Sequence, residues 1–400
     1  MGSVTRSPDI LYLAPDLDDT AIGRRTEFPR LGGARVRLAG FRRKKGALAG
    51  PAVELGHTRN GAMLQRIGAV VKALPWLSRR LGLRQPPEII LARNLEMLAL
   101  GAWLQLRYPG AVLVYEVLDI HRLMLGPGRT ARVLRWIEAV LLARVGLTII
   151  SSPGFQKNYL AAYERPVSDL ILVENKPLAP QSALSSGRPE GRRRGPVTPG
   201  KITIGWFGNL RCAWSLSTLD ALTRAAPGRY GVILRGKPAY DAVPEFDAVV
   251  AANPDMQFLG AYRWPEDLAA IYAGVDLAWL IDRYDPGTNS DWLLPNRLYE
   301  GCLHLAVPVH LAGTETAARL NALGIGLAVA QPDPVLVRQV LDDVQPATVE
   351  ALRQAVAGVP ASVWQADIDE CRGLVARMVT CRPRTKVRHT NADPLPESDT

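Results

Sequence analysis

The sequence predicts an α/β fold of two doubly wound, Rossmann-like domains that face a central cleft. The first observation is size, because 400 residues, 48% of them hydrophobic, exceed what one core usually contains. The second is order, since strand-like apolar runs alternate with helical patterns in two separate series. Residues 181–200, rich in Gly, Pro, Ser and Arg, divide the series and are typical of a linker. We therefore expect one domain over residues 1–180 and a second over residues 201–345.

The first domain contains five strand-like runs, with helical stretches between most of them. They are ILYLA (10–14), ARVRLAGF (34–41), EIILAR (88–93), AVLVYEV (111–117) and LTIISS (147–152). Because strands joined through helices pair in parallel, the pattern predicts a parallel sheet.

The second domain repeats this order. Its runs are KITIGWFG (201–208), YGVILRG (230–236), MQFLGAY (256–262), VDLAWLI (275–281), VPVHL (307–311) and GLAVA (326–330). Residues 346–380 have helical patterns and could cross to the first domain, whereas residues 381–400 are polar and predicted to be disordered. Open parallel sheets bind ligands at the carboxyl ends of their strands, so we expect the functional groups there.

Positive charge is concentrated in the first half of the chain. Residues 1–180 carry 26 Lys/Arg and 14 Asp/Glu, whereas residues 201–400 carry 18 and 23. The stretches 35–45 and 62–84 combine cationic and apolar residues, as do segments that lie on an anionic membrane surface. The alternative for the second stretch is an amphipathic helix that covers the first sheet. No recognised nucleic-acid motif accompanies the charge, so we expect no nucleic-acid partner.

The cysteines indicate a reducing compartment. Cys212, Cys302, Cys371 and Cys381 have no CxxC spacing, which argues against a zinc site and a disulfide framework and fits a cytoplasmic protein. We expect no signal peptide, and the apolar run AVLLARVGLTII is too short for a membrane span and is interrupted by Arg144. The spaced carboxylates of DLDD and IDRYD lack a convincing metal context, so we expect neither a metal nor another cofactor.

The stretch LLPNRLYEG, residues 293–301, places a helix start after a strand. The free N–H groups and the positive dipole end of such a start can bind a diphosphate, and Pro295 suits the first helical position. Glu300 follows about one and a half turns later. A carboxylate there can accept two hydrogen bonds from the vicinal diol of a ribose. The alternative is an ion pair between Glu300 and Arg297 on a solvated face.

PNRLYEG, between VDLAWLID and VPVHL, resembles the donor-binding segment of GT-B glycosyltransferases. PDLDDTAIGRR and LGGARVRLAGFRRK near the start, LARNLEMLALG and YEVLDIHRLM in the middle, and WFGNLR after the linker agree with this resemblance. Over residues 9–340, these motifs are similar to those of bacterial exopolysaccharide glycosyltransferases of the succinoglycan type. The resemblance implies a GT-B fold and transfer of a hexose, expected to be glucose from a UDP donor, to a lipid-linked oligosaccharide. It also implies that Glu300 holds the ribose of the donor, and that the enzyme works at the inner face of the cell membrane.

The remaining donor-binding candidates lie at predicted strand ends or beside Glu300. With Glu300, the predicted set is Asn296, Arg297, Gly208, Arg211, Arg235, Lys237, Tyr262 and His121. A glycine permits close approach of the backbone to a phosphate, and an arginine or lysine can neutralise its charge. The alternatives are a solvated basic loop for the cations, a core position for Tyr262 and a structural role for His121.

Asp119 is predicted as the general base. Many retaining GT-B enzymes carry Glu-x7-Glu, but Trp292, with Asp291 beside it, occupies the position of the first glutamate. This departure favours an inverting reaction, which needs a base near the acceptor hydroxyl. Asp119 follows the strand AVLVYEV and is expected to face the cleft. The alternative is a turn cap.

Acceptor-binding groups are expected at the ends of the first-domain strands. They are Asp18, Asp19, Arg24, Arg25, Arg93 and Asn94. The arginines Arg24 and Arg25 could meet an acceptor diphosphate, and the aspartates could bind hydroxyl groups. The alternative for each is a solvated loop residue. Two other functions also remain open, namely a hydrolysing nucleotide-sugar epimerase of the same architecture and a non-catalytic partner of another transferase.

Overall fold

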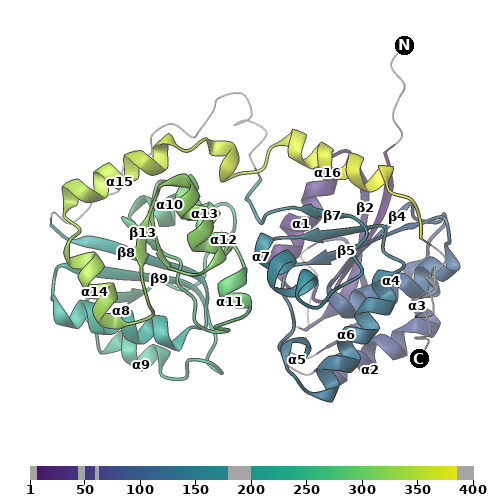
Figure 1. Cartoon of the computed structure of the whole chain (residues 1–400), viewed down its shortest axis with the longest axis horizontal. Helices are drawn as coiled ribbons and strands as arrows, with labels where there is room; N and C mark the ends of the chain where they lie inside the picture. The colour runs from purple at the N-terminus through teal and green to yellow at the C-terminus, as the bar shows by residue number, and fades with distance from the viewer. Residues whose placement is uncertain (1–6, 44–49, 59–62, 179–199, 385–400) are drawn as a thin grey trace, which may run out of the picture.

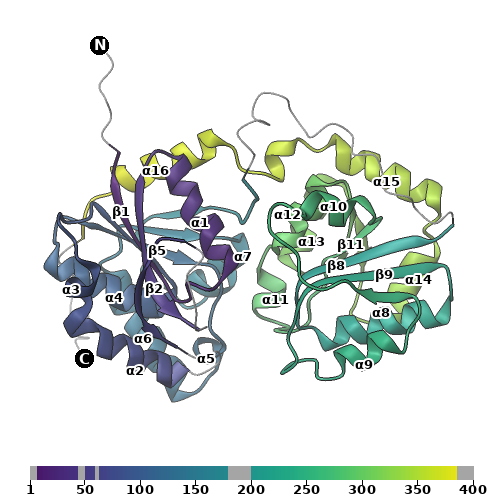
Figure 2. The same cartoon turned by 180° about the vertical axis from the view of Figure 1, so that it is seen from behind.

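The computed structural model describes residues 7–43, 50–58, 63–178 and 200–384, and these residues form two parallel sheets covered by helices (Figure 1, Figure 2). This confirms the predicted α/β class. The predicted linker lies almost wholly outside the described residues, as do Lys44, Lys45 and most of the predicted tail.

The first sheet has seven strands in the order β3-β2-β1-β4-β5-β6-β7, all parallel. Its strands are β1 (Asp9–Ala14), β2 (Arg35–Arg42), β3 (Val53–His57), β4 (Ile89–Arg93), β5 (Val112–Val117), β6 (Leu147–Ile150) and β7 (Leu170–Leu172). Its helices are α1 (Thr20–Leu31), α2 (Met63–Ala73), η1 (Leu74–Trp76), α3 (Leu77–Leu81), α4 (Asn94–Arg107), α5 (Arg122–Leu125), α6 (Arg129–Leu142), α7 (Pro153–Phe155) and the π-helical η2 (Gln156–Ala161). The strand order switches direction between β1 and β4, as in doubly wound folds.

The second sheet has six parallel strands in the order β10-β9-β8-β11-β12-β13. They are β8 (Ile202–Leu210), β9 (Tyr230–Pro238), β10 (Met256–Phe258), β11 (Leu277–Trp279), β12 (Val307–Leu311) and β13 (Leu327–Val329). The helices are α8 (Ala213–Ala225), α9 (Phe246–Ala251), α10 (Leu268–Ala273), α11 (Asn289–Trp292), α12 (Asn296–Leu303), α13 (Glu315–Leu323) and α14 (Pro334–Asp342). All six predicted strands are present, and β8 and β9 each extend two residues beyond their predicted ends.

Strands β3 and β7 were not predicted. Both are edge strands of the first sheet, and β7 has only three residues, none of them buried. Strand β3 contains Glu54 and Gly56 and buries one residue of five, Leu55. Edge strands have one partner and little burial, so they need no sustained apolar pattern.

The last helices of the described residues run back along the molecule. Helix α15 (Pro346–Gly358) lies along the second domain, and after η4 (Ala361–Val363) helix α16 (Ile368–Thr380) packs against α1 (Figure 1). Cys371, Leu374, Val375 and Met378 of α16 share a buried cluster with the β1 residues Ile10 and Tyr12. A Cβ at Gly32 would collide with the backbone of Cys371, so a glycine lets α16 approach the end of α1. Helix α16 thus forms part of the core of the first domain.

Two features of the structure bear on the predicted membrane contact. Arg42 is buried and bonds Asp18, with Nη2 2.8 Å from Oδ1, so its assignment to an exposed basic surface was wrong. Strand β2 is paired on both sides, and its last four residues, Ala39–Arg42, are all buried. No helix in the described part of the chain is both long and apolar enough to cross a membrane.

Candidate active site

Glu300 lies inside the protein at the boundary between the two domains. Helix α12 begins at Asn296, one residue later than predicted, and Pro295 occupies the N-cap position instead of the first helical position. The Glu300 side chain is 4% exposed, and its Oε1 accepts a hydrogen bond of 2.9 Å from the Trp264 indole Nε1. Arg24 of helix α1 lies with Nη1 3.7 Å from the same oxygen. The alternative of a solvated ion pair with Arg297 is therefore excluded.

Arg24 connects the two domains at this point. Its guanidinium carbon lies 4.7 Å from the centre of the Trp264 ring, within the range of a cation–π contact. Its Nε and Nη1 are buried and have no hydrogen-bond partner among the described residues. Burial disfavours the charged form of both groups. It lowers the pKa of Arg24, against the opposing effect of the Glu300 charge, and it raises the pKa of Glu300. A buried guanidinium with unused N–H groups is suited to a further anion.

Three predicted donor-binding residues lie on the same helix as Glu300 or within reach of its charge. Arg297 donates from Nη2 to the Leu280 carbonyl at 3.1 Å, while its buried Nε has no hydrogen-bond partner in the described part of the chain. Tyr262 is half-buried, and its pKa is raised first by burial and then by the Glu300 charge. Asn296 is half-buried at the start of α12. The structure thus brings Asn296, Arg297, Glu300 and Tyr262 together.

Gly208 and Gly236 allow β8 and β9 to run side by side to their ends. They are register partners with φ of 103° and 127°, and a Cβ at Gly236 would collide with the Gly208 carbonyl. Arg235 donates to the Leu259 carbonyl at 3.2 Å, and its buried Nε is without a hydrogen-bond partner among the described residues. Lys237 is exposed. No described contact joins these residues to Glu300, so their donor-binding role stays a prediction.

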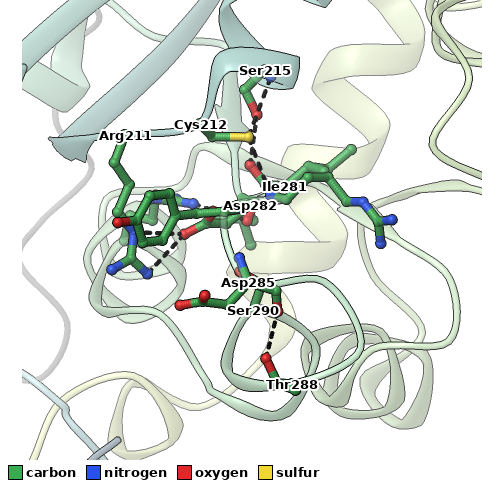
Figure 3. Close-up of polar contacts among 12 residues, drawn as sticks. Arg211, Cys212, Ser215, Ile281, Asp282, Asp285, Thr288 and Ser290 are labelled. Atoms are coloured by element: carbon green, nitrogen blue, oxygen red, sulfur yellow. Dashed lines mark hydrogen bonds and ion pairs between the residues drawn. The ribbon is translucent and has the colours of Figure 1, made fainter. Parts of the chain in front are cut away.

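Arg211 belongs to a cluster at the end of β11 (Figure 3). It pairs with Asp282, Nη2 to Oδ2 at 3.1 Å, and its guanidinium lies 4.6 Å from the centre of the Tyr284 ring. Arg122 from the first domain lies 4.3 Å from the centre of the same ring and pairs with Asp285. Burial would raise the pKa of Asp282, but the cations Arg297 and Arg211 outweigh it and hold that pKa below its usual value. Arg211 therefore helps to order the segment that contacts the first domain.

The loop after β5 is fixed from both domains. Asp119 is exposed, and its Oδ1 accepts a hydrogen bond of 3.0 Å from Asn94 Nδ2. The next residue, Ile120, is held by Asn289, which donates to its carbonyl at 2.7 Å and accepts from its N–H at 3.0 Å. Ser152 also donates to the Trp292 carbonyl at 2.5 Å. The predicted base is thus an accessible carboxylate on a loop that the second domain clamps.

His121 caps helix α5, because its Nδ1 accepts from the Leu123 N–H at 3.2 Å. Burial, followed by the Arg66 charge, lowers its pKa, so the ring is neutral at neutral pH. A capping role is therefore present in the structure, and contact with a donor stays a prediction.

The predicted acceptor residues fall into two groups. Asp19 caps α1 through the Ala21 N–H at 2.9 Å and lies 3.5 Å from Arg93 Nη2. Arg93 is buried, and its Nε and Nη1 lack hydrogen-bond partners among the described residues. Arg93 also feels the charge of Asp119, which bonds Asn94, and Arg24 feels the charges of Asp19 and Arg93. These four predicted residues therefore lie near one another, with both arginines buried.

The other two predicted acceptor residues, Asp18 and Arg25, bond to residues of the first domain. Arg25 is buried and pairs with Glu116 at 2.6 Å, and it also donates to the Val173 carbonyl at 3.1 Å. Asp18 accepts from the Arg43 N–H at 2.8 Å as well as from Arg42. These contacts stabilise the first domain, and an acceptor role for Asp18 and Arg25 stays a prediction.

Sequence reasoning missed Trp264 and Asn289. Both lie in segments without apolar periodicity, and both act through contacts with residues far away in the sequence. The described residues contain no group of three or more His, Cys, Asp or Glu side chains placed to hold a metal ion.

No model of a known protein family matches the chain. A curated relative decides the family: succinoglycan biosynthesis protein ExoL of Rhizobium meliloti (strain 1021) is 43% identical over 380 residues, which cover 93% of each chain. The chain belongs to the ExoL family of exopolysaccharide biosynthesis glycosyltransferases.

Solved structures similar to this ExoL-family chain have the GT-B fold. Anabaena HepE in complex with UDP and glucose is 17% identical with a TM-score of 0.63, and the match covers 92% of this chain and 98% of HepE. Sucrose-phosphate synthase from Thermosynechococcus elongatus is 14% identical with a TM-score of 0.65, covering 93% and 98%. An E. coli structure described as trehalose-6-phosphate bound with UDP-2-fluoro glucose is 11% identical with a TM-score of 0.67, covering 94% and 99%. These similarities show that the ExoL-family chain has the predicted GT-B fold.

Proposed function

We propose that this chain transfers a hexose, with glucose as the first candidate, from a UDP-sugar to a lipid-linked oligosaccharide. The observation that carries the proposal is the buried Glu300 carboxylate at the domain boundary, beside Arg24 and Arg297. ExoL, by its name, serves succinoglycan biosynthesis, and HepE has been solved with UDP and with UDP-glucose. Both support a nucleotide-sugar donor in this family.

The donor would bind chiefly to the second domain. Both described contacts of Glu300 reach Oε1, so we assign Oε2 to the ribose diol. The diphosphate would lie at the start of α12, where backbone N–H groups and the helix dipole favour an anion. The buried Nε–H of Arg297 would neutralise part of its charge. This arrangement supports departure of UDP without a metal ion.

Asp119 would act as the general base toward the acceptor. Its carboxylate takes the proton of the acceptor hydroxyl, whose oxygen attacks the anomeric carbon while the bond to the UDP oxygen breaks. UDP leaves with the bonding electron pair, and the configuration inverts. Asn94 holds the carboxylate, and Arg93 with Arg24 would bind a diphosphate that links the saccharide to its lipid. A lipid-linked acceptor would place the enzyme on the cytoplasmic side of the membrane as a peripheral protein.

A transfer assay tests the proposal. Purified protein is incubated with radiolabelled nucleotide sugars, one at a time, with and without lipid extract from membranes that produce the polysaccharide. We expect label to enter the lipid fraction, from a UDP-sugar, only when the extract is present. Donor turnover that is the same with and without the lipid extract would indicate a hydrolysing epimerase. Donor binding without turnover would indicate a non-catalytic partner, and either result would overturn the proposal.

A further inference from the structure

Helix α6 has one buried face and one exposed face that is apolar and basic. Ala131, Leu134 and Leu142 are buried, and Glu138 accepts hydrogen bonds from Tyr115 at 3.0 Å and Tyr159 at 2.7 Å. These contacts fix the rotation of the helix about its axis.

The opposite face of α6 exposes large apolar side chains. Val133 is 54% exposed, Trp136 is 66% exposed and Val140 is 46% exposed. These spacings of three and four residues place them in one stripe. Arg129 and Arg132 are exposed beside it, and both line a shallow hollow with Val133 and Trp136. A tryptophan so open to water, with arginines around it, is unusual unless it meets a partner.

Neighbouring helices on the same side of the sheet also expose large apolar side chains. Helices α2 and α6 both contact α4, and Figures 1 and 2 show all three on the side of the first sheet away from α1 and α16. Val71 of α2 is 58% exposed, Trp76 of η1 is 56% exposed and Leu106 of α4 is 66% exposed. Trp76 lines a second hollow with Arg79 and Arg80. We call Val71, Trp76, Leu106, Val133, Trp136 and Val140, with Arg79, Arg129 and Arg132, the tryptophan face.

The tryptophan face carries positive charge that its own helices do not offset. Residues 58–87 contain no Asp or Glu, and Glu138, the only acid of α6, is buried. Glu96 of α4 pairs with Arg66 at 3.3 Å, and its side chain is 9% exposed. A second copy of this chain would bring like charges to the same contact, so self-association is disfavoured.

We propose that the tryptophan face docks on an anionic lipid bilayer, with Trp136 and Trp76 inserted at the interface. Amphipathic aromatic rings favour the level of the lipid headgroups, and arginines beside them attract anionic lipids. The proposal rests on the proposed function for its biological meaning, because a lipid-linked acceptor must be reached at a membrane. It adds α6 and α4 to the surface predicted from residues 62–84 alone.

Vesicle binding tests this inference without donor or acceptor. The full chain is mixed with vesicles of phosphatidylcholine, or of phosphatidylcholine with phosphatidylglycerol, and sedimented at low and high salt. We expect binding to the anionic vesicles that weakens with salt. Arg129→Gln and Arg132→Gln should each weaken it about fivefold, and Trp136→Ser about tenfold or more. Val335→Ser is the matched control, since Val335 is 61% exposed on α14 of the other domain.

Brominated lipids give a second readout. They should quench part of the tryptophan fluorescence of the wild-type chain, and Trp136→Phe and Trp76→Phe should each remove part of that quenching, since only inserted rings are reached. Binding that is equal for both lipids, or unchanged in the Trp136 and arginine variants, would overturn the inference. Dimerisation in lipid-free solution that Trp136→Ser abolishes would instead assign the face to a second copy.

The test of membrane docking can be distinguished from the test of the proposed function. Trp136→Ser should keep transfer to an acceptor presented in detergent micelles while losing transfer to the same acceptor in vesicles. A chain that binds vesicles but transfers no sugar would refute the proposed function and leave the docking surface standing.

Discussion

Arg24 of the first domain lies 3.7 Å from Glu300 of the second, and Trp264 contacts both. The three side chains join the two domains at the position where the sequence predicts the ribose of a nucleotide sugar. Both charged groups are nearly excluded from water, and a buried ion pair is by itself weak evidence for a stabilising role because desolvation offsets the attraction. This relationship leads to a prediction about pH.

Glu300→Gln should change how stability depends on pH. Burial raises the folded pKa of Glu300 above its ordinary value of 4.5, so the folded protein binds its proton more tightly than the unfolded chain. The contribution of this group to stability is therefore complete below that value and is lost as pH rises through the folded pKa. As pH rises from 4 to 8, the melting temperature of the wild type should therefore fall relative to that of Glu300→Gln. Parallel curves would show that the folded pKa of Glu300 is ordinary.

Asp119→Asn should abolish most transfer while the protein stays folded. Removing a general base typically costs about 10² to 10⁴ in rate, and the amide oxygen of the substituted side chain can still accept the hydrogen bond from Asn94. Melting temperature and UDP affinity should be unchanged. Asn94→Ala, which removes only the support of the carboxylate, should cost much less. If Asp119→Asn is nearly as active as the wild type, Asp119 is not the base.

The product should have inverted stereochemistry. Trp292 stands where retaining enzymes often carry a glutamate, and the structure uses its backbone carbonyl to accept from Ser152. Proton NMR of the product made from an α-linked donor should show a β-linked sugar. An α-linked product would assign a retaining reaction and remove the need for Asp119 as a base.

Gly154→Ala should disturb the contact between the domains. A Cβ at Gly154 would collide with the backbone of Trp292, and neither backbone can move away cheaply. We expect a loss of stability of about 1–3 kcal/mol and slower transfer, with UDP affinity preserved because the donor site lies mainly on the second domain. Gly373→Ala is the control, since Gly373 is an exposed position of α16 where an added Cβ would meet no other atom. Equal transfer in both variants would show that this contact is dispensable.

The sequence predicts the sheets well because their central strands are continuous apolar runs. Strands β3 and β7 lack that signal, since an edge strand buries little. Asn94 and Asp119 were both placed at strand ends, and they meet because β4 and β5 are neighbours in the sheet. The pairing of Arg42 with Asp18 and the contact of Trp264 with Glu300 depend on how separate loops fold over one another. No local pattern encodes such contacts.

The most direct test of the central claim is calorimetry of UDP binding to the wild type and to Glu300→Gln, with Glu266→Gln as a control at an exposed acid of the second domain. If Glu300 binds the ribose diol, Glu300→Gln should weaken binding by roughly 1–3 kcal/mol, and the control should not. With 2′,3′-dideoxyuridine diphosphate, which lacks the diol, the wild type and Glu300→Gln should bind equally. Equal affinity of both proteins for UDP itself would contradict the assignment of Glu300 to the donor.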